Sequence, residues 1–431
     1  MIRTLGALFA ACLILSPLHA QAQTAEPRAV VDRVAQLIAD NYFDPAKAAD
    51  VAAMLRERAN AGGFDRYTNP GDLAAQITTL IEPHDHHFRV EWSAAGAAPQ
   101  QAAGPPPNME RFRRAVARGN YGFVRAEMLP GGVGYIDMRS FAHFQPQDAA
   151  TSPARRAADA AMTMIANAEA VIIDLRDNSG GSPAMVGYLA AYFTPEDADI
   201  YNTFHSRDGE GSEAPFVEPS GARMLDRPLY ILISGRTASA AESFAYTLQA
   251  AGRAIVVGAP SAGGANPGGY RPVGDGFRVF ISDATPINPI THGNWEGDGV
   301  QPNIAAAAED ALDRARVLAL ESVAANAQSE DARAEAEWAL AAWQSRGAAI
   351  RNARQYVGAY GPRSIHIEDG RLVLRRDRRP ALTLTPIAPD LFAVQDAAPQ
   401  QRVRFERDAR GRIVAFDLLL ISGEVLRNAR E

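Results

Sequence analysis

The chain has 431 residues, a formal net charge of −7 and 47% hydrophobic residues. This composition is typical of a globular protein and leaves room for two or three domains. The negative charge and the lack of a basic cluster with interleaved aromatic residues argue against a nucleic-acid partner. Lysine and cysteine occur once each, as Lys47 and Cys12.

Residues 1–22 are predicted to be a secretory signal peptide. Arg3 gives a basic start, residues 5–15 form an apolar run, and Ala20-Gln21-Ala22 is a small-residue cleavage site. The run is too short to span a bilayer, and the residues before Cys12 match a lipid-anchor signal poorly. We therefore expect an exported chain in the periplasm or the medium. Its mature form would have no disulfide, no thiol nucleophile and no transmembrane segment.

The next segments differ sharply in composition. Residues 23–92 are predicted to be an N-terminal helical bundle, because apolar residues recur at helical spacing as far as about residue 82. Residues 93–118 open with SAAGAAPQQAAGPPP and are expected to be a linker.

Residues 119–325 are predicted to be an α/β core. Short apolar strand candidates alternate there with helical segments, which favours a largely parallel sheet covered by helices. The strands are expected at 132–138, 170–176, 229–233, 254–258 and 277–282, and the helices at 154–168, 183–193 and 240–251. A helical connector at 326–350 and a small all-β domain at 351–431 complete the expected organisation.

Ser239 occupies a turn between a predicted strand and a predicted helix, in the stretch SGRTASAAESFAY. With Glu242 it fits a capping box, in which the serine caps the helix and the glutamate reaches back. The same position suits a nucleophile, because the free N–H groups of a helix N-terminus, including that of Ala240, favour developing negative charge. This stretch alone leaves both interpretations open.

A second strand-to-helix turn has the sequence DLRDNSGGSP. Gly180 and Gly181 permit unusual backbone angles and close approach of a ligand. The pair is either a tight turn that requires glycine or the source of an oxyanion-hole amide. Asp174 and Arg176, at the end of the strand, are interpreted as a structural ion pair.

Three histidines, His84, His86 and His87, lie within PHDHHFRV. A metal site needs three or four converging ligands, and no matching carboxylate–histidine pattern occurs elsewhere, so no metal or cofactor is expected. The histidines are either polar loop residues or the source of a general base for a serine.

A carboxylate that orients the base would come from NWEGDGVQPN, where Glu296 follows a tryptophan. Asp298 and His292 are nearby rivals for these roles, and a turn with solvated acids is the simpler alternative.

Taken together, the chain resembles the S41 peptidases, the family of tail-specific proteases and of the tricorn and interphotoreceptor retinoid-binding proteins. The matching stretches follow the family order over roughly residues 30–315 and include DHHFRV, VIIDLRDNSGGSP, TASAAESFAY, VVGAPSAGGANPGG and INPITHGNWEGDGVQPN. The resemblance implies a crotonase-like (ClpP-like) α/β core behind a helical N-terminal bundle.

The family has two catalytic plans, and the sequence discriminates between them. Tail-specific members use a Ser–Lys dyad with the lysine 25 residues after the serine, where this chain has Gly264. The tricorn-like plan uses serine, histidine and glutamate, which the resemblance places at Ser239, His87 and Glu296. His86 remains an alternative to His87.

The sequence therefore predicts an exported serine peptidase that acts on polypeptides. Ser239 would be the nucleophile, His87 the base and Glu296 the orienting carboxylate, with Gly180 or Gly181 and Ala240 as oxyanion donors. Two alternatives are a non-catalytic carrier of apolar ligands and an adaptor that binds extended peptides at a sheet edge.

Overall fold

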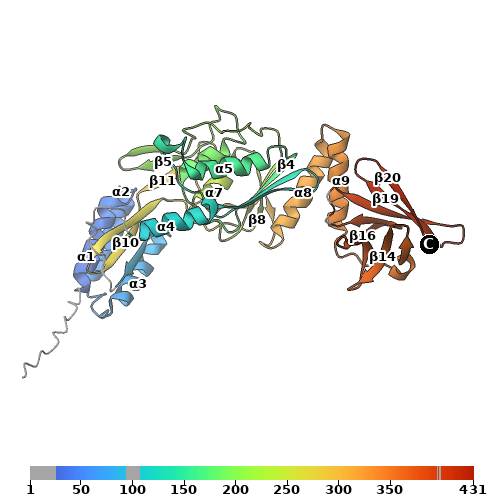
Figure 1. Ribbon diagram of the computed structural model, residues 1–431. Coiled ribbons are helices and arrows are strands. Elements are labelled where there is room, and N and C mark those ends of the chain that lie inside the picture. The colour runs from blue at the N-terminus through green and yellow to red at the C-terminus, as the bar shows by residue number, and fades with distance from the viewer. Residues whose placement is uncertain (1–25, 94–106, 396, 398) are drawn as a thin grey trace, which may run out of the picture. The chain divides into compact units, whose positions relative to one another are not determined.

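The computed structural model describes residues 26–93, 107–395, 397 and 399–431 (Figure 1). The predicted signal peptide and the first part of the predicted linker lie outside these residues. The chain divides into two units. The first contains the N-terminal helices together with residues 270–281, and the second contains most of the remaining chain.

The first unit pairs helices with a three-stranded antiparallel sheet of order β1-β10-β9. Its elements are α1 (Pro27–Asn41), α2 (Pro45–Asn60), α3 (Pro70–Ile81), η1 (Glu82–His84), β1 (Arg89–Trp92), β9 (Gly268–Gly274) and β10 (Phe277–Ser282). Each of the three α-helices begins at a proline, whose fixed φ suits the first helical position. Asn69 caps α3 by accepting from the N–H groups of Gly71 and Asp72.

The second unit is built on a six-stranded sheet of order β12-β8-β7-β4-β3-β2. The strands are β2 (Phe123–Leu129), β3 (Val133–Met138), β4 (Ala170–Asp174), β7 (Leu229–Ile233), β8 (Ile255–Gly258) and β12 (Ile304–Ala305). All neighbouring pairs are parallel except β2 with β3. Because β3, β4 and β7 are buried throughout, they consist of nearly continuous apolar runs.

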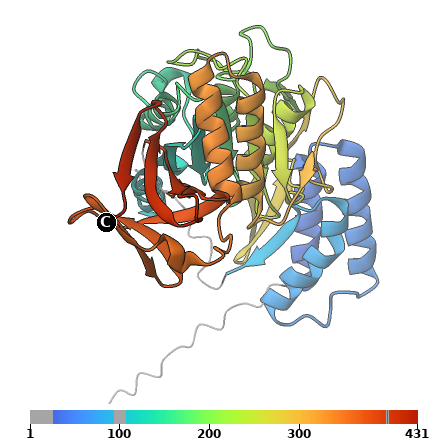
Figure 2. The same ribbon diagram turned by 90° about the vertical axis from the view of Figure 1, so that its right-hand side faces the viewer.

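Helices cover both faces of this sheet. On one face α5 (Pro153–Met164), α6 (Pro183–Ala190) and α7 (Ala240–Ala250) share a core with Ile136, Ile173 and Ile231. On the other face α8 (Ala311–Asn326) and α9 (Glu330–Gln344), side by side in Figure 2, pack on Ile172 and Leu232. The remaining elements are η2 (Asn120–Gly122), η3 (Pro146–Asp148) and a sheet of β11 (Ala284–Ile287), β5 (Thr203–Ser206) and β6 (Gly209–Ser212).

The C-terminal part is an eight-stranded antiparallel sheet whose strands follow chain order. After η4 (Ala353–Tyr356) come β13 (Gly358–Tyr360), β14 (Arg363–Glu368), β15 (Arg371–Arg375), β16 (Leu382–Ala388), β17 (Leu391–Val394), β18 (Gln401–Arg407), β19 (Ile413–Leu420) and β20 (Val425–Ala429). Its core holds a cluster of aromatic rings from Tyr356, Tyr360, Phe392, Phe405 and Phe416.

The predicted fold class is confirmed, with an α/β core, N-terminal helices and a C-terminal all-β part. One segment differs from its description as a linker, because Pro107–Arg118 forms helix α4. Residues 108–118 contain no glycine or further proline and are rich in arginine and alanine, which favour helix.

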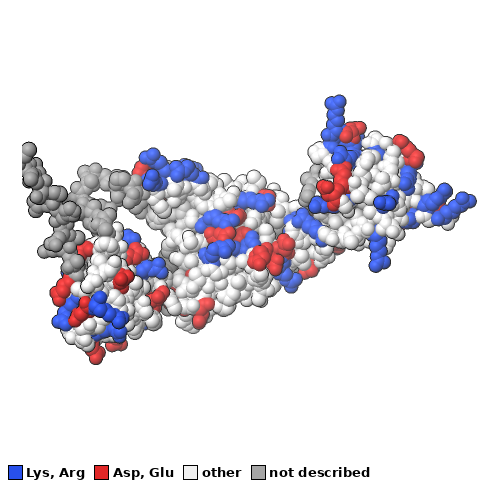
Figure 3. All heavy atoms as spheres, turned by 90° about the horizontal axis from the view of Figure 1, so that it is seen from below, with Lys and Arg blue, Asp and Glu red and all other residues white. Residues whose placement is uncertain are grey.

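Charged side chains of both signs lie interspersed on the face of the molecule drawn in Figure 3. Arg375 and Glu368 form an ion pair between the neighbouring strands β15 and β14, and Arg427 and Glu406 form one between β20 and β18, on either side of β19. Among the helices of the described ranges, none combines the length and the apolar character needed to cross a bilayer.

Candidate active site

Two strand-to-helix turns meet at the carboxyl end of the central sheet. One follows β4 and contains Gly180 and Gly181, and the other follows β7 and contains Ser239. A Cβ added to Gly180 would lie 2.8 Å from the Cβ of Ser239 and 3.1 Å from the N of Ala240. The two sequence motifs are thus one structural site, at the edge where parallel sheets place their active residues.

Ser239 has φ 53° and ψ −123°, a conformation that residues other than glycine rarely adopt. An ordinary N-cap has extended, unstrained backbone angles, so capping does not explain this conformation. A strained strand–turn–helix that lifts a serine out of the turn is typical of nucleophile elbows. Ser239 is exposed, whereas its neighbour Ala240 is buried.

Glu242 organises the serine turn from inside the protein. Its carboxylate is fully buried and accepts from the N–H of Ser239 at 2.7 Å, which is the half of the predicted capping box in which the glutamate reaches back. It also accepts from the Ser261 hydroxyl and from the N–H groups of Gly263 and Gly264. One carboxylate therefore ties Ser239 to the loop that follows β8.

The same loop holds Glu296. Glu296 Oε2 accepts from the N–H groups of Ala265 at 2.7 Å and Asn266 at 3.1 Å. The neighbouring Trp295 is buried and donates its indole N–H to the carbonyl of Gly264. Residues 263–266 thus connect the carboxylate of Glu242, and through it Ser239, with the carboxylate of Glu296.

The two glycines differ in the availability of their amides. The N–H of Gly180 donates to Asn178 Oδ1 at 2.9 Å, and Asn178 also accepts from the N–H of Ala238 through its carbonyl. Gly181 is exposed, and within the described ranges no hydrogen bond is found for its N–H. Of the two glycines predicted as oxyanion donors beside Ala240, Gly181 therefore has the available amide, whereas Gly180 allows the close approach to Ser239.

A groove of about 990 Å³ borders the glycine turn and is lined by Gly180, Gly181 and, from α4, the exposed Phe112. His143 also lines this groove, with Nδ1 2.8 Å from the hydroxyl oxygen of Ser182. His143 has no role among the sequence-based predictions. Its position shortly after β3, at the carboxyl edge of a parallel sheet, is the signal that would have identified it.

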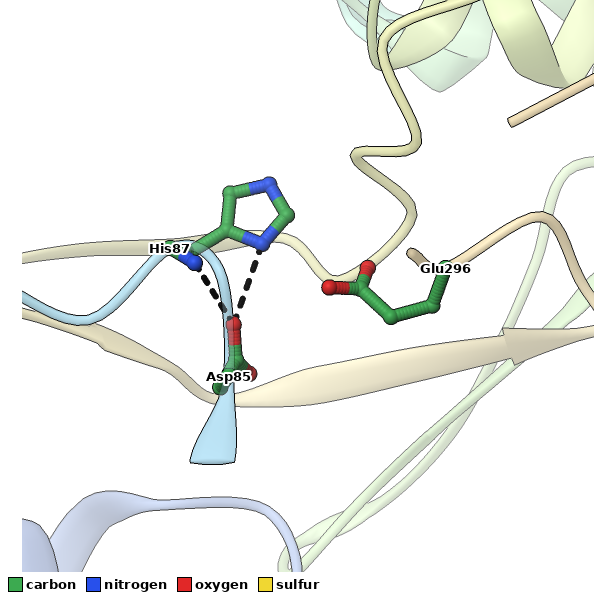
Figure 4. Close-up of side chains that lie close together, drawn as sticks. All are labelled: Asp85, His87 and Glu296. Carbon is green, nitrogen blue, oxygen red and sulfur yellow. Dashed lines mark hydrogen bonds and ion pairs between the residues drawn. The ribbon is translucent and has the colours of Figure 1, made fainter. Parts of the chain in front are cut away.

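The predicted base belongs to the first unit, where Asp85 fixes it. Asp85 Oδ1 accepts from the N–H of His87 at 2.8 Å and lies 3.2 Å from His87 Nδ1; Figure 4 marks both interactions. The Asp85 side chain is fully buried, and the His87 ring stacks on Phe280 at 6.0 Å. Nδ1 faces Asp85, and Nε2 is the other ring nitrogen. Glu296, also drawn in Figure 4, belongs to the second unit.

The other candidates have simpler environments. His86, His292 and Asp298 are exposed. Asp174 and Arg176 form the predicted structural ion pair, since two guanidinium nitrogens donate to the two carboxylate oxygens at 2.9 and 2.6 Å.

A comparison with protein-family models finds a match for the region that contains Ser239. Residues 132–306 match the model of Peptidase family S41. Carboxyl-terminal-processing peptidase 3 of Arabidopsis thaliana, a chloroplastic protein, is 29% identical over 136 residues, which cover 32% of this chain and 25% of the relative. The carboxyl-terminal-processing protease of Synechocystis is 30% identical over 125 residues, 29% of this chain and 28% of the relative. The chain thus spans about a quarter of the length of these curated relatives.

Among solved structures, the photosystem II D1 C-terminal processing protease matches with a TM-score of 0.42 and 14% identity, over 66% of this chain and 94% of that one. The matched sequence region, residues 132–306, contains the glycine turn, Ser239 and Glu296. This region of the chain is thus similar to the peptidases of family S41.

Proposed function

We propose that the protein is an exported serine peptidase in which Ser239 attacks the carbonyl carbon of a peptide bond. The observation that carries the proposal is the strained conformation of Ser239, φ 53° and ψ −123°, on an exposed turn against Gly180. Strain of this kind costs about 1–3 kcal/mol, persists only where the surrounding structure enforces it, and clusters at active sites. The names of both curated relatives include carboxyl-terminal processing, which supports polypeptides as the substrate class.

In the proposed mechanism His87 Nε2 accepts the proton of Ser239 as the serine oxygen bonds to the carbonyl carbon. The carbonyl oxygen becomes an oxyanion that accepts from the N–H groups of Ala240 and Gly181. Each such donor contributes about 2.7–4 kcal/mol to transition-state stabilisation in other serine hydrolases. The imidazolium then protonates the leaving amine as the C–N bond breaks, and water hydrolyses the acyl-enzyme by the same steps.

Two carboxylates are candidates for supporting His87. Asp85 faces Nδ1 within the first unit, and we assign it the role of holding the ring and its tautomer. Glu296, predicted as the orienting carboxylate, is fixed by two backbone amides in the loop linked to Ser239. We keep Glu296 as a proposed member of the site that stabilises the imidazolium.

Labelling with a fluorophosphonate probe tests the proposal on the purified mature protein. The wild type should label, and Ser239→Ala and His87→Ala should not, because the probe needs an activated serine. Ser206→Ala, at an exposed residue of β5, is a matched control and should label normally. Labelling of Ser239→Ala at the wild-type rate would contradict the nucleophile assignment.

The variant His143→Ala tests whether His87 or His143 acts as the base. His143 lines the groove within the same unit as Ser239, so it is the rival base. Retained labelling in His143→Ala together with lost labelling in His87→Ala supports the proposed base, and the reverse result would reassign it. Folded wild-type protein that does not label would favour the carrier or adaptor function instead.

A further inference from the structure

A second cavity, of about 320 Å³, lies in the second unit between β2, α8, α9 and the strands β17 and β18. Its lining includes Leu129 and Pro130, which lead into the amino end of β3. Ser239 follows the carboxyl end of β7, and β3 and β7 run parallel on either side of β4. The cavity therefore lies at the amino ends of these parallel strands, whereas the candidate active site lies at their carboxyl ends, so the two are separate.

The charge of this cavity is strongly one-sided. Its lining contains four arginines, Arg125, Arg316, Arg346 and Arg402, and one acid, Glu127. Arg125 pairs with Glu127 at 2.7 Å. Positive charges gathered around a small, partly enclosed volume repel one another more strongly than they would in open water. A bound anion would relieve this repulsion.

Two tryptophans set the orientation of three guanidiniums. The Cζ atoms of Arg316 and Arg346 lie 3.8 and 3.7 Å from the centre of the Trp343 ring. Since one ring face has room for a single guanidinium at this distance, the two arginines lie on opposite faces. A stacked guanidinium contacts the ring with its plane and directs its N–H groups along the edge, where Arg346 Nε donates to Gln395 Oε1 at 3.5 Å.

Arg402 supplies an independent indication. It stacks on Trp338 at 4.2 Å, and its Nε is buried without a hydrogen-bond partner in the described part of the chain. Burial lowers the pKa of Arg402, and the charge of Glu337 opposes that shift. A buried donor on a cavity wall is stabilised when a ligand offers it an acceptor.

We propose that this arginine–tryptophan pocket (Arg125, Arg316, Arg346, Arg402, Trp338 and Trp343) binds a compact anion that carries carboxylate or phosphate groups. Both groups present paired oxygens that match the N–H edge of a guanidinium. The volume corresponds to roughly ten water molecules at about 30 Å³ each, which suits a small polyanion rather than a folded partner. The proposal is independent of the peptidase function.

The test uses the mature protein with pyrophosphate and citrate as probes, and chloride at equal ionic strength as the reference. Each probe that binds should raise Tm saturably, by several degrees, and change tryptophan fluorescence with the same midpoint. A response to pyrophosphate alone or citrate alone assigns the pocket to phosphate or to carboxylate. Equal Tm and fluorescence in all three salts would overturn the proposal.

Arg402→Gln should weaken probe binding by at least tenfold, and the exposed Arg378→Gln is the matched control that should bind normally. Arg346→Gln is a second variant in case Arg402→Gln does not fold. A folded Arg402→Gln or Arg346→Gln that binds both probes as the wild type does would also overturn the assignment. Fluorophosphonate labelling should remain in these variants, which keeps this test apart from that of Ser239.

Discussion

Gly180 lies so close to Ser239 that a methyl group on Gly180 would fall 2.8 Å from the Cβ of the serine. Gly180 also has φ 105°, a backbone angle that residues other than glycine rarely adopt. The contact and the backbone conformation make this glycine a requirement of the serine turn rather than a flexible residue.

Gly180→Ala should therefore displace Ser239 and reduce the rate of fluorophosphonate labelling by at least 100-fold, with a stability loss of about 1–3 kcal/mol for the strained backbone. Gly209→Ala is the matched control, since Gly209 has φ 141° but a methyl group added to it would have nothing within 4 Å. It should carry a similar backbone strain and label normally. Equal labelling of the two variants would show that the close approach does not matter.

Glu242→Gln tests the buried carboxylate beneath the serine. Four donors converge on Glu242, and an amide would present an NH₂ group to some of them. We expect a loss of about 2–4 kcal/mol in the free energy of unfolding, because buried donors lose their acceptor. Urea denaturation measures it. Ser261→Ala removes one of these four donors and also the acceptor of the buried Val300 N–H, so it should lose about 1–3 kcal/mol. A neutral Glu242→Gln would contradict this account.

Asp85→Asn and Glu296→Gln distinguish the two carboxylates proposed to support His87. If Asp85 holds the tautomer, Asp85→Asn should lower kcat by about 10²–10⁴ with little change in KM, since the amide donates where the carboxylate accepts. Glu296→Gln should lower kcat less than Asp85→Asn does. The pH midpoint of its reaction should also lie nearer to that of the wild type than the midpoint of Asp85→Asn. The pH profiles of both variants on an unstructured polypeptide measure this, and a larger effect of Glu296→Gln would return the orienting role to Glu296.

Glu213 predicts a pH dependence of stability. Burial raises the pKa of Glu213 from 4.5 to about 7, against the opposing effect of hydrogen bonds from Ser243 and Asn202. The folded state therefore binds a proton that the unfolded state has released, so the free energy of unfolding falls as pH rises from about 4.5 to 7. The fall is on the order of 3 kcal/mol.

Glu213→Gln should remove most of this dependence, because the amide has nothing to ionise. Chemical denaturation at pH values of about 4.5, 6 and 7.5, which bracket the shift, gives the comparison. Glu309→Gln, at an exposed residue, is the control and should keep the wild-type slope. A wild type whose stability is flat or rises over this range would show that Glu213 is not buried as a neutral acid.

The serine turn shows what local pattern can predict. The apolar run before Ser239, the small residues around it and Glu242 predicted a strand, a turn and a capped helix, and β7 and α7 begin and end within one residue of expectation. These features depend on residues that are adjacent in sequence, and a local sequence pattern describes those residues directly. The proximity of Gly180 to Ser239 was a hypothesis from two motifs, and only the parallel pairing of β4 with β7 brings them together.

Other parts of the site depend on contacts that no local pattern encodes. The choice between Gly180 and Gly181 rests on the side chain of Asn178, which takes one amide and leaves the other. Asp85 lies within two residues of His84, His86 and His87 in sequence, and only the structure shows that it contacts His87. Strands such as β6 and β9 were missed because glycine and polar residues replace the apolar alternation that marks a strand.

The sheet of the first unit has a consequence for the order in which the chain acquires structure. Strand β1 ends at Trp92, but its partner β10 begins at Phe277, so nearly two hundred residues separate them. A chain made from its N-terminus therefore holds α1 to α3 without their sheet until about residue 282 has emerged. The fragment 26–93 should show no cooperative urea transition by circular dichroism. The histidine that we propose as the base would then reach its final environment, including its stack on Phe280, only after the serine turn has been synthesised.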